Sequence, residues 1–322
     1  MAPTAHTKGL SRPELRLQWV GRQEVVRLAG SIPRSKLRRI AELSTGEEDS
    51  GNAIIHADNL RALMALAPTL HDRVDVAFLD PPYNAAREHW VYPDPVLDWF
   101  GSVVGAEGED PLRHDKWLSM MYPRLAWLHV LLAESGALFL TLDDHEAHHA
   151  RVLLDEIFGP ENFLTNIAWE RTRSPEDTGS PFLESHTHII AYAKNARTWR
   201  PNPLAKKLPT IWDFEETHSV HGSPDSRLRP HGVTSSLLPF VPKPIKLLRR
   251  ILRVAAGPNA LVLDPFAGSG TTARAVLEQN ASDGGDRKFI LIEADDRAQA
   301  LIARNLSGAP DAPLAYGFYN LA

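Results

Sequence analysis

The chain has 322 residues, of which 43% are hydrophobic and 23% charged, and these values exclude an intrinsically disordered or fibrous protein. It contains no cysteine, which excludes disulfides, thiolate zinc sites and a cysteine nucleophile and favours a reducing, cytoplasmic location. The sequence has neither an apolar run of about 18 residues nor a secretory signal, so we expect no membrane partner. The net charge of −5 argues mildly against nucleic acid, because nucleic-acid-binding domains usually carry a basic surface.

Short apolar runs alternate with helical patterns along most of the chain. Strands are predicted at 53–56, 74–79, 137–142, 260–263 and 289–292. Helices are predicted at 58–67, 116–133, 146–158, 244–255, from 271 onward and at 296–305. Strands that alternate with helices of this length predict an α/β fold with a mostly parallel sheet covered by helices on both faces.

Two regions depart from this alternation. Residues 1–45 are basic, with nine lysines and arginines against three glutamates. Residues 170–242 are rich in Pro, Ser, Thr, Gly and His and show little periodicity, so we expect an insertion that lies outside the sheet. The chain is therefore divided into a basic N-terminal extension, a first half of the main domain, an inserted region and a second half, at 1–50, 51–169, 170–242 and 243–322.

A glycine loop follows the strand predicted at 260–263. It reads Asp264-Pro265-Phe266-Ala267-Gly268-Ser269-Gly270, and a helix begins at Thr271. The glycines permit positive φ and close approach of a ligand, and the helix N-terminus offers free N–H groups to an anion. The loop lacks a P-loop lysine and the third glycine of a dinucleotide fingerprint. The next strand ends near Glu293, an acid that can accept hydrogen bonds from ribose, so the pair favours an adenosine-containing ligand over a simple packing turn.

A second motif, Asp80-Pro81-Pro82-Tyr83, follows the strand predicted at 74–79. The two prolines remove backbone donors and leave outward-facing carbonyl acceptors, Asp80 adds a carboxylate, and Tyr83 adds an aromatic face. A planar amino group needs such a site, with two acceptors for its N–H bonds and a ring that stacks on the base. The alternative is a rigid turn in which Asp80 caps a helix. The presence of the glycine loop favours the amino-group site.

Together the two motifs resemble the catalytic and cofactor motifs of S-adenosylmethionine-dependent DNA amino-methyltransferases of the beta class, in which the catalytic motif comes first. Further stretches are similar to Mod subunits of type III restriction–modification systems. These are His56-Ala57-Asp58-Asn59-Leu60, Asp115–Met121, Leu142-Asp143-Asp144, Asp155–Gly159, Lys243-Pro244 and Arg287–Leu291. The similarity spans about 53–170 and 240–306. The chain is shorter than Mod subunits usually are, so we expect a small recognition region.

The resemblance implies a Rossmann-like class I methyltransferase fold, circularly permuted, with a small target-recognition insertion. It implies S-adenosylmethionine as the cofactor, bound by Asp58, Lys243, Pro244, Asp264, Pro265, Phe266, Ala267, Gly268, Ser269, Gly270, Thr271 and Glu293. In this interpretation Glu293 binds the ribose and Asp58 the adenine, and Ala57 stands where a glycine is usual. Asp80 and the Pro82 carbonyl would hold the target amino group while Tyr83 stacks on the flipped base.

The predicted reaction is methyl transfer to N6 of adenine in double-stranded DNA, since Asp in the first motif position is associated with adenine in the family. N4 of cytosine is the alternative, followed by a catalytically inactive DNA-binding subunit, an RNA substrate and protein glutamine methylation. A homodimer and a restriction subunit are expected partners. The DNA contacts are predicted in the inserted region, at Arg171, Arg173, Arg197, Arg200, Lys206, Lys207, Arg227 and Arg229.

The fourteen histidines show no spacing typical of a metal site, and none is predicted. His145, His148 and His149 are interpreted as residues on the solvated face of a helix. Asp143-Asp144-His145-Glu146 predicts a capping box at the start of that helix, and this structural role is favoured over a catalytic one.

Overall fold

The computed structural model describes residues 16–31, 35–46, 50–84, 111–172, 181–182, 184–203, 207–217, 242–307 and 315–322. Its strands are β1 (Leu37–Arg39), β2 (Ala53–His56), β3 (Val74–Leu79), β4 (Leu132–Leu142), β5 (Phe163–Glu170), β6 (His186–Ala193), β7 (Ile211–Trp212), β8 (Leu261–Asp264), β9 (Lys288–Glu293) and β10 (Gly317–Leu321). Its helices are α1 (Arg22–Ser31), α2 (Asn59–Leu70), α3 (Arg113–Leu131), α4 (Ala147–Phe158), α5 (Phe214–Thr217), α6 (Ile245–Ala255), α7 (Thr271–Asp283) and α8 (Asp296–Ser307), with short 3₁₀ turns η1 (Ala41–Leu43) and η3 (Pro160–Asn162).

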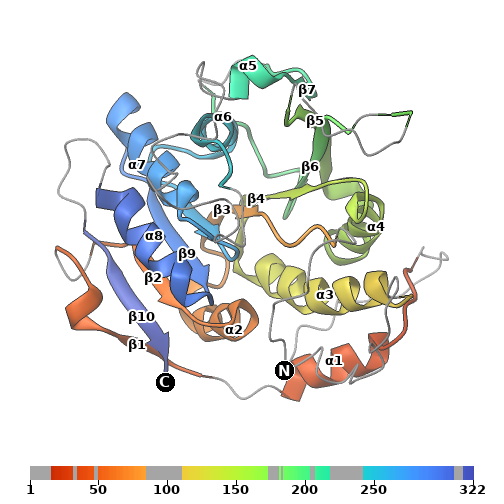
Figure 1. Ribbon diagram of the computed structural model, residues 1–322, viewed down its shortest axis with the longest axis horizontal. Coiled ribbons are helices and arrows are strands. Elements are labelled where there is room, and N and C mark those ends of the chain that lie inside the picture. Colours follow the sequence, from red (N-terminus) through yellow and green to blue (C-terminus); the bar gives the residue numbers. More distant parts are fainter. Residues whose placement is uncertain are drawn as a thin grey trace.

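The ten strands form one sheet in the order β1-β10-β2-β9-β8-β3-β4-β6-β5-β7 (Figure 1). The run from β10 to β4 is parallel, whereas β6 is antiparallel to β4 and β5. The prediction of a mostly parallel sheet is confirmed for its central strands. β8 and β9 come late in the chain but lie between β2 and β3. The relation of this chain order to other methyltransferases, the circular permutation, stays a prediction.

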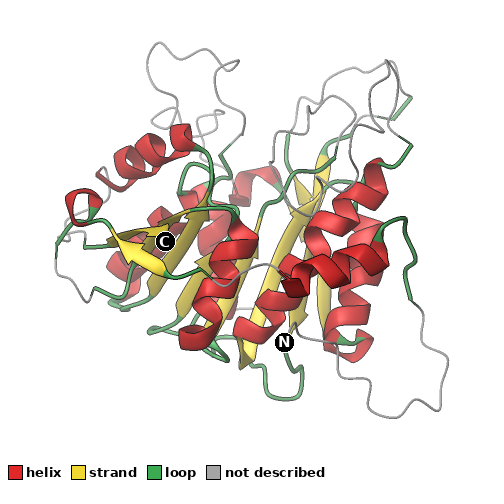
Figure 2. Ribbon diagram, turned by 90° about the horizontal axis from the view of Figure 1, so that it is seen from below, coloured by secondary structure: helices red, strands yellow, loops and turns green. Residues whose placement is uncertain are grey.

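Helices cover both faces of the sheet (Figure 2), because side chains of the buried strands alternate between two apolar cores. One core joins Leu79 of β3 to α2, α3 and α4 through Leu60, Leu125 and Leu153. The other joins Phe78, the preceding residue, to α6, α7 and α8. The three-layer arrangement that the sequence predicts is therefore present.

The inserted region contributes to the sheet, so the expectation that 170–242 lies outside it is wrong for β6 and for the short β7, which pairs with β5. β6 pairs with β4 over six residues, from Ala137↔Ala193 to Leu142↔His188, and its buried face carries Ile190 and Tyr192. The periodicity of apolar residues does not predict this strand, because two of the first three residues of β6 are histidines. β6 is also distant in sequence from its partner β4. Residues 218–241, where further recognition residues are predicted, lie outside the described residues.

The basic N-terminal region packs against the domain where it is described. Trp19 donates from Nε1 to Ser119 Oγ (2.9 Å), and the guanidinium of Arg22 binds both carboxylate oxygens of Glu156. β1 pairs antiparallel with β10 at the edge of the sheet. Arg22 of this basic region therefore already has a carboxylate partner.

Candidate active site

Three acids from different strands face one pocket at the carboxyl edge of the sheet. Asp264 and Glu293 end β8 and β9, and Asp80 directly follows β3. β8 and β3 are parallel neighbours whose chains continue to opposite faces, which makes this point the switch point where α/β sheets bind ligands. The pocket has a volume of about 470 Å³, part of it open to solvent, and is lined by Phe78, Asp80, Pro242, Lys243, Leu248, Asp264, Phe266, Ala267, Gly268, Ser269, Thr271, Thr272 and Glu293.

The glycine loop has the backbone that its sequence predicts. Gly268 and Gly270 have φ values of 50° and 79°, and a Cβ on Gly270 would lie 3.0 Å from the side chain of Ile302. The loop closes back on the sheet, because the Ala267 amide donates to the Ile292 carbonyl (3.1 Å). A larger residue at position 270 would therefore be both strained and crowded.

The acids of the loop side are buried and hydrogen-bonded. Burial raises the pKa of Asp264 to about 7, although its carboxylate accepts from Thr272 Oγ1 (2.5 Å) and the Phe266 amide (3.0 Å). Burial also raises the pKa of Glu293, which accepts from the backbone amides of Gly268, Ala294 and Asp295. These three bonds use most of the four acceptor positions of a carboxylate. Two ribose hydroxyls would therefore have to replace one of the amide contacts of Glu293.

The Asp80 turn, residues 80–84, carries a dense polar network. Asp80 Oδ1 accepts from Tyr83 Oη (3.0 Å) and Thr141 Oγ1 (2.6 Å), and Oδ2 accepts from Lys243 Nζ (2.6 Å). Burial opposes the charge of Lys243, but the Asp80 carboxylate outweighs it and the pKa of Lys243 is raised. Burial and Asp80 likewise raise the pKa of Tyr83, so its phenol stays neutral. Lys243 thus links the cofactor motif to the catalytic motif.

The Pro82 carbonyl, predicted as an acceptor for the target amino group, is already bonded. Trp117 on α3 donates to it from Nε1 over 2.8 Å, a contact that the sequence does not reveal because the two residues lie on different elements. The described residues place no donor on the Pro81 carbonyl. Unlike the Pro82 carbonyl, the carbonyl of the buried Pro81 therefore has no hydrogen-bond partner in the described part of the chain.

Four of the predicted cofactor residues do not line the pocket. Asp58 instead caps α2 by accepting from the Arg61 amide and pairs with Arg124 (3.0 Å). Its neighbour Asn59 donates to the carbonyl of Pro265 (2.9 Å) and so supports the glycine loop from behind. Pro244, Pro265 and Gly270 do not line the pocket either. Pro244 and Gly270 directly precede α6 and α7.

Pocket residues that sequence reasoning missed are Phe78, Pro242, Leu248 and Thr272, together with Thr141 and Trp117 beside the turn. For Thr141 a signal exists, because it lies near the carboxyl end of the strand that neighbours β3. Phe78 and Thr272 adjoin the two predicted motifs in the sequence. Trp117 and Leu248 require the packing of α3 and α6 to be known.

The predicted DNA contacts are not all near the pocket. Arg171 is exposed and follows β5 at the carboxyl edge, the same edge as the Asp80 turn. Arg197 and Arg200 follow β6, which runs antiparallel, so they lie at the opposite edge, roughly 17 Å away along six residues of strand. Lys207 is exposed. The other predicted contacts, Arg173, Lys206, Arg227 and Arg229, lie outside the described residues.

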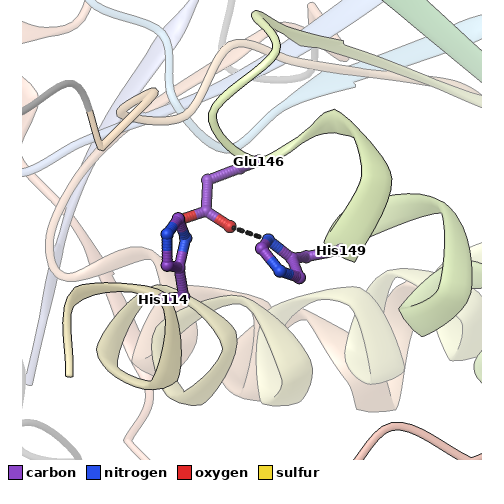
Figure 3. A group of neighbouring side chains, drawn as sticks. All are labelled: His114, Glu146 and His149. Atoms are coloured by element: carbon purple, nitrogen blue, oxygen red, sulfur yellow. Dashed lines mark hydrogen bonds and ion pairs between the residues drawn. The ribbon is translucent and has the colours of Figure 1, made fainter. Parts of the chain in front are cut away.

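The capping box predicted at 143–146 is wrong. Asp143 Oδ1 accepts from the His145 amide (3.0 Å), but the Glu146 side chain makes no capping bond at the start of α4 and is fully buried. Glu146 binds His114 and His149 instead (Figure 3). The interpretation of His149 as merely solvated is therefore also wrong, and its pKa is raised by the hydrogen bond to Glu146.

The strand order and the acid-lined pocket at the switch point define a Rossmann-like class I methyltransferase fold. Residues 74–304 match the family model described as DNA methylase, and the chain belongs to this family. The PvuII DNA methyltransferase (cytosine-N4-specific) has the same fold, with a TM-score of 0.55 and 17% identity over 84% of this chain and 92% of that chain.

Two curated relatives differ in length. The StyLTI Mod subunit of a type III restriction–modification enzyme from Salmonella typhimurium is 28% identical over 77% of this chain and 53% of its own length. The DNA adenine methyltransferase YhdJ of Escherichia coli K12 is 22% identical over 81% of this chain and 84% of its own. The chain thus spans about half the length of the Mod subunit. No helix among the described residues is long and apolar enough to cross a bilayer.

Proposed function

We propose that the chain transfers a methyl group from S-adenosylmethionine to N6 of adenine in double-stranded DNA, with the target base flipped into the pocket. The observation that carries the proposal is the ion pair between Asp80 and Lys243. Asp80 Oδ2, which belongs to the acceptor for the amino group, lies 2.6 Å from Nζ of Lys243 on the cofactor side of the same pocket. The family match and the relatives named as Mod subunit and adenine methyltransferase support the same reaction.

The residues of the pocket fit this cofactor. S-adenosylmethionine, when bound, supplies an electrophilic methyl group on a sulfonium cation. Asp80, Asp264 and Glu293 give the lining three acids against the single cation of Lys243, which suits a positively charged ligand. The amides of the glycine loop and the N-terminus of α7 would bind its anionic end, and Glu293 its ribose.

The turn would hold the target amino group. Asp80 accepts one N–H, and the Pro81 carbonyl accepts the other, in place of Pro82. Both bonds raise the electron density on the nitrogen as its new bond to the methyl carbon forms and the carbon–sulfur bond of the sulfonium breaks. Asp80 stabilises the positive charge that develops on the nitrogen until the nitrogen releases one proton. Because Tyr83 Oη already occupies Asp80 Oδ1, we expect the phenol to leave this oxygen when its ring stacks on the base.

Adenine is favoured over cytosine because an Asp opens the catalytic motif and because the relative YhdJ is named an adenine methyltransferase. N4 of cytosine is the second candidate, since PvuII methyltransferase is named cytosine-N4-specific. Arg171 lies on the edge that a flipped base must approach. Among the described residues that we predict to contact DNA, it is the best placed. A cytoplasmic location, a homodimer and a restriction subunit complete the proposal.

The test is to incubate the purified chain with duplex DNA and labelled S-adenosylmethionine and to identify the modified nucleoside after digestion. We expect N6-methyladenine. If N4-methylcytosine were the sole modified nucleoside found, the choice of adenine would be overturned. No methyl transfer, together with no rise in melting temperature on addition of the cofactor, would favour an inactive DNA-binding subunit instead.

A further inference from the structure

A fully buried carboxylate lies next to the Asp80 turn without touching the pocket. Glu146 projects from the start of α4 and lies beside His114 and His149 (Figure 3). It accepts hydrogen bonds from these two side chains and from Asn84. The donors are His114 Nδ1 on α3 at 2.7 Å, His149 Nδ1 on α4 at 3.0 Å and Asn84 Nδ2 at 2.5 Å. A buried carboxylate is stabilised when donors fill its acceptor positions, and here three donors do so.

Asn84 is the residue that connects this carboxylate to the catalytic motif. It directly follows Tyr83, its side chain is buried, and its φ of 60° lies in the left-handed region. Its amide also donates to the carbonyl of Arg113 (3.1 Å). Because a non-glycine residue in this region costs free energy, the surrounding contacts must hold it there. Glu146 and Arg113 supply those contacts.

The histidines act as fixed donors toward Glu146. Arg113 Nε is always a donor, and it lies 3.2 Å from His114 Nε2, so that nitrogen must accept and the ring proton resides on Nδ1. His114, Glu146 and His149 have their ligand-type atoms within 4.8 Å of one another, which is a spacing seen in metal sites. A protonated Nδ1 has no lone pair for a metal, and the Arg113 contact therefore favours a hydrogen-bonded group over a metal site.

We propose that Glu146 is a positioning residue for the methyl-transfer reaction and that it acts through Asn84. The Asp80 turn would then be held at three points, by Thr141 and Lys243 at Asp80, by Trp117 at Pro82 and by Glu146 at Asn84. The last contact fixes where the chain leaves Tyr83 and so fixes the direction of its ring. This inference rests on the proposed function, because it concerns the geometry of the same reaction.

The first test separates the hydrogen bond from Asn84 to Glu146, called the tether below, from the backbone strain at Asn84. Asn84→Gly keeps the positive φ at no cost but removes the amide, whereas Asn84→Ala removes the amide and keeps the strain. We expect kcat for methyl transfer to fall about tenfold in Asn84→Gly and further in Asn84→Ala, with KM for S-adenosylmethionine within twofold of wild type. Wild-type kcat in Asn84→Gly would overturn the proposal.

The second test uses the carboxylate itself. Glu146→Ala should match the loss of kcat in Asn84→Gly, and Glu146→Gln should restore at least part of it, since an amide oxygen can still accept from Asn84 and His114. The exposed Glu161 provides a matched control, Glu161→Gln, with unchanged kcat. Equal losses in Glu146→Ala and Glu146→Gln, or a KM that rises as much as kcat falls, would indicate a merely structural role and overturn the proposal.

A third measurement does not depend on activity. Hydrogen–deuterium exchange of the peptide that contains Tyr83 should become faster in Asn84→Gly and Glu146→Ala, while the peptide of the glycine loop keeps its wild-type rate. Unchanged exchange at Tyr83 would overturn the proposal even if wild-type protein transfers methyl groups. If wild-type protein transfers none, the proposed function fails, and faster exchange would still show the tether.

Discussion

The glycine loop and the Asp80 turn line the same pocket, but different kinds of bonds hold them. The loop has hydrogen bonds within itself, such as Gly270 N to the Ala267 carbonyl (2.8 Å) and Phe266 N to Asp264 (3.0 Å). It also accepts hydrogen bonds from the distant side chains of Asn59 and Asn305. The turn is held by side chains distant in sequence, Trp117, Thr141 and Lys243, which are 35, 61 and 163 residues from their partners. The loop conformation therefore depends partly on contacts within the loop itself, whereas the turn conformation depends on the assembled domain.

This difference suits the two tasks. The loop must present amides and a close-approach surface to a ligand, which positive-φ glycines provide by themselves. The turn must keep a carboxylate and a phenol in a low-dielectric site, and a charged group there needs a partner. Lys243 is that partner, and it also lies 5.1 Å from the centre of the Tyr83 ring. Changes in the turn should therefore affect transfer, and changes in the loop should affect cofactor binding.

The largest effect is expected for Asp80→Ala. Loss of the acceptor removes stabilisation of the charge that develops on the amino nitrogen, so transfer should fall by about 1000-fold or more. Binding of S-adenosylhomocysteine, measured by calorimetry, should change no more than about threefold. Asp286→Ala, at an exposed position, serves as the control with wild-type transfer. Parallel losses of binding and transfer in Asp80→Ala would contradict the separation of the two regions.

Gly270→Ala should break the loop side. The change forces a side chain into the left-handed region and to 3.0 Å from Ile302, and we expect the free energy of unfolding to fall by about 2 kcal/mol. Gly284→Ala has the positive φ but open space, so a loss of about 1 kcal/mol is expected. Gly257→Ala has open space and no positive φ, so its effect should be the smallest. Urea unfolding of the three variants measures this order, and a loss in Gly257→Ala equal to that in Gly270→Ala would refute it.

Asn59→Ala should weaken the loop from outside it. The variant leaves the Pro265 carbonyl without its donor and removes the acceptor of the buried Arg124. We expect cofactor affinity to fall about tenfold, or about 1.4 kcal/mol, with kcat at saturating cofactor close to wild type. Asn195→Ala, on an exposed turn after β6, is the matched control. A fall in kcat without a change in affinity would place Asn59 with the Asp80 turn instead.

The same contrast explains how much the sequence could predict. The central parallel strands, the glycine loop and the Asp-Pro-Pro-Tyr motif follow from local patterns, and the structure has them. The sequence could not assign β6 to the sheet or the bond from Trp117 to the Pro82 carbonyl, because both depend on which elements become neighbours. Glu146 shows the same limit. Its sequence pattern is a capping box, and only the fold reveals that its carboxylate is buried against Asn84.

The smallest effect concerns pH and Asp264, one of the two buried acids of the loop side. Burial raises the pKa of Asp264 to about 7, against about 3.9 in an unfolded chain. The folded protein therefore binds more protons between these values, and its free energy of unfolding falls as pH rises through that window and levels off above about 7. Between pH 6.5 and 7.5 the fall should be less than about 1 kcal/mol.

Asp264→Asn removes this titration, so its thermal unfolding without cofactor should vary less with pH than that of wild type, while Asp286→Asn should keep the wild-type slope. The pKa of Glu293 is also raised, and a slope that persists in Asp264→Asn would assign the effect to Glu293. A sulfonium cation bound in the pocket would favour the charged form of Asp264, so saturating S-adenosylmethionine should flatten the wild-type slope as well.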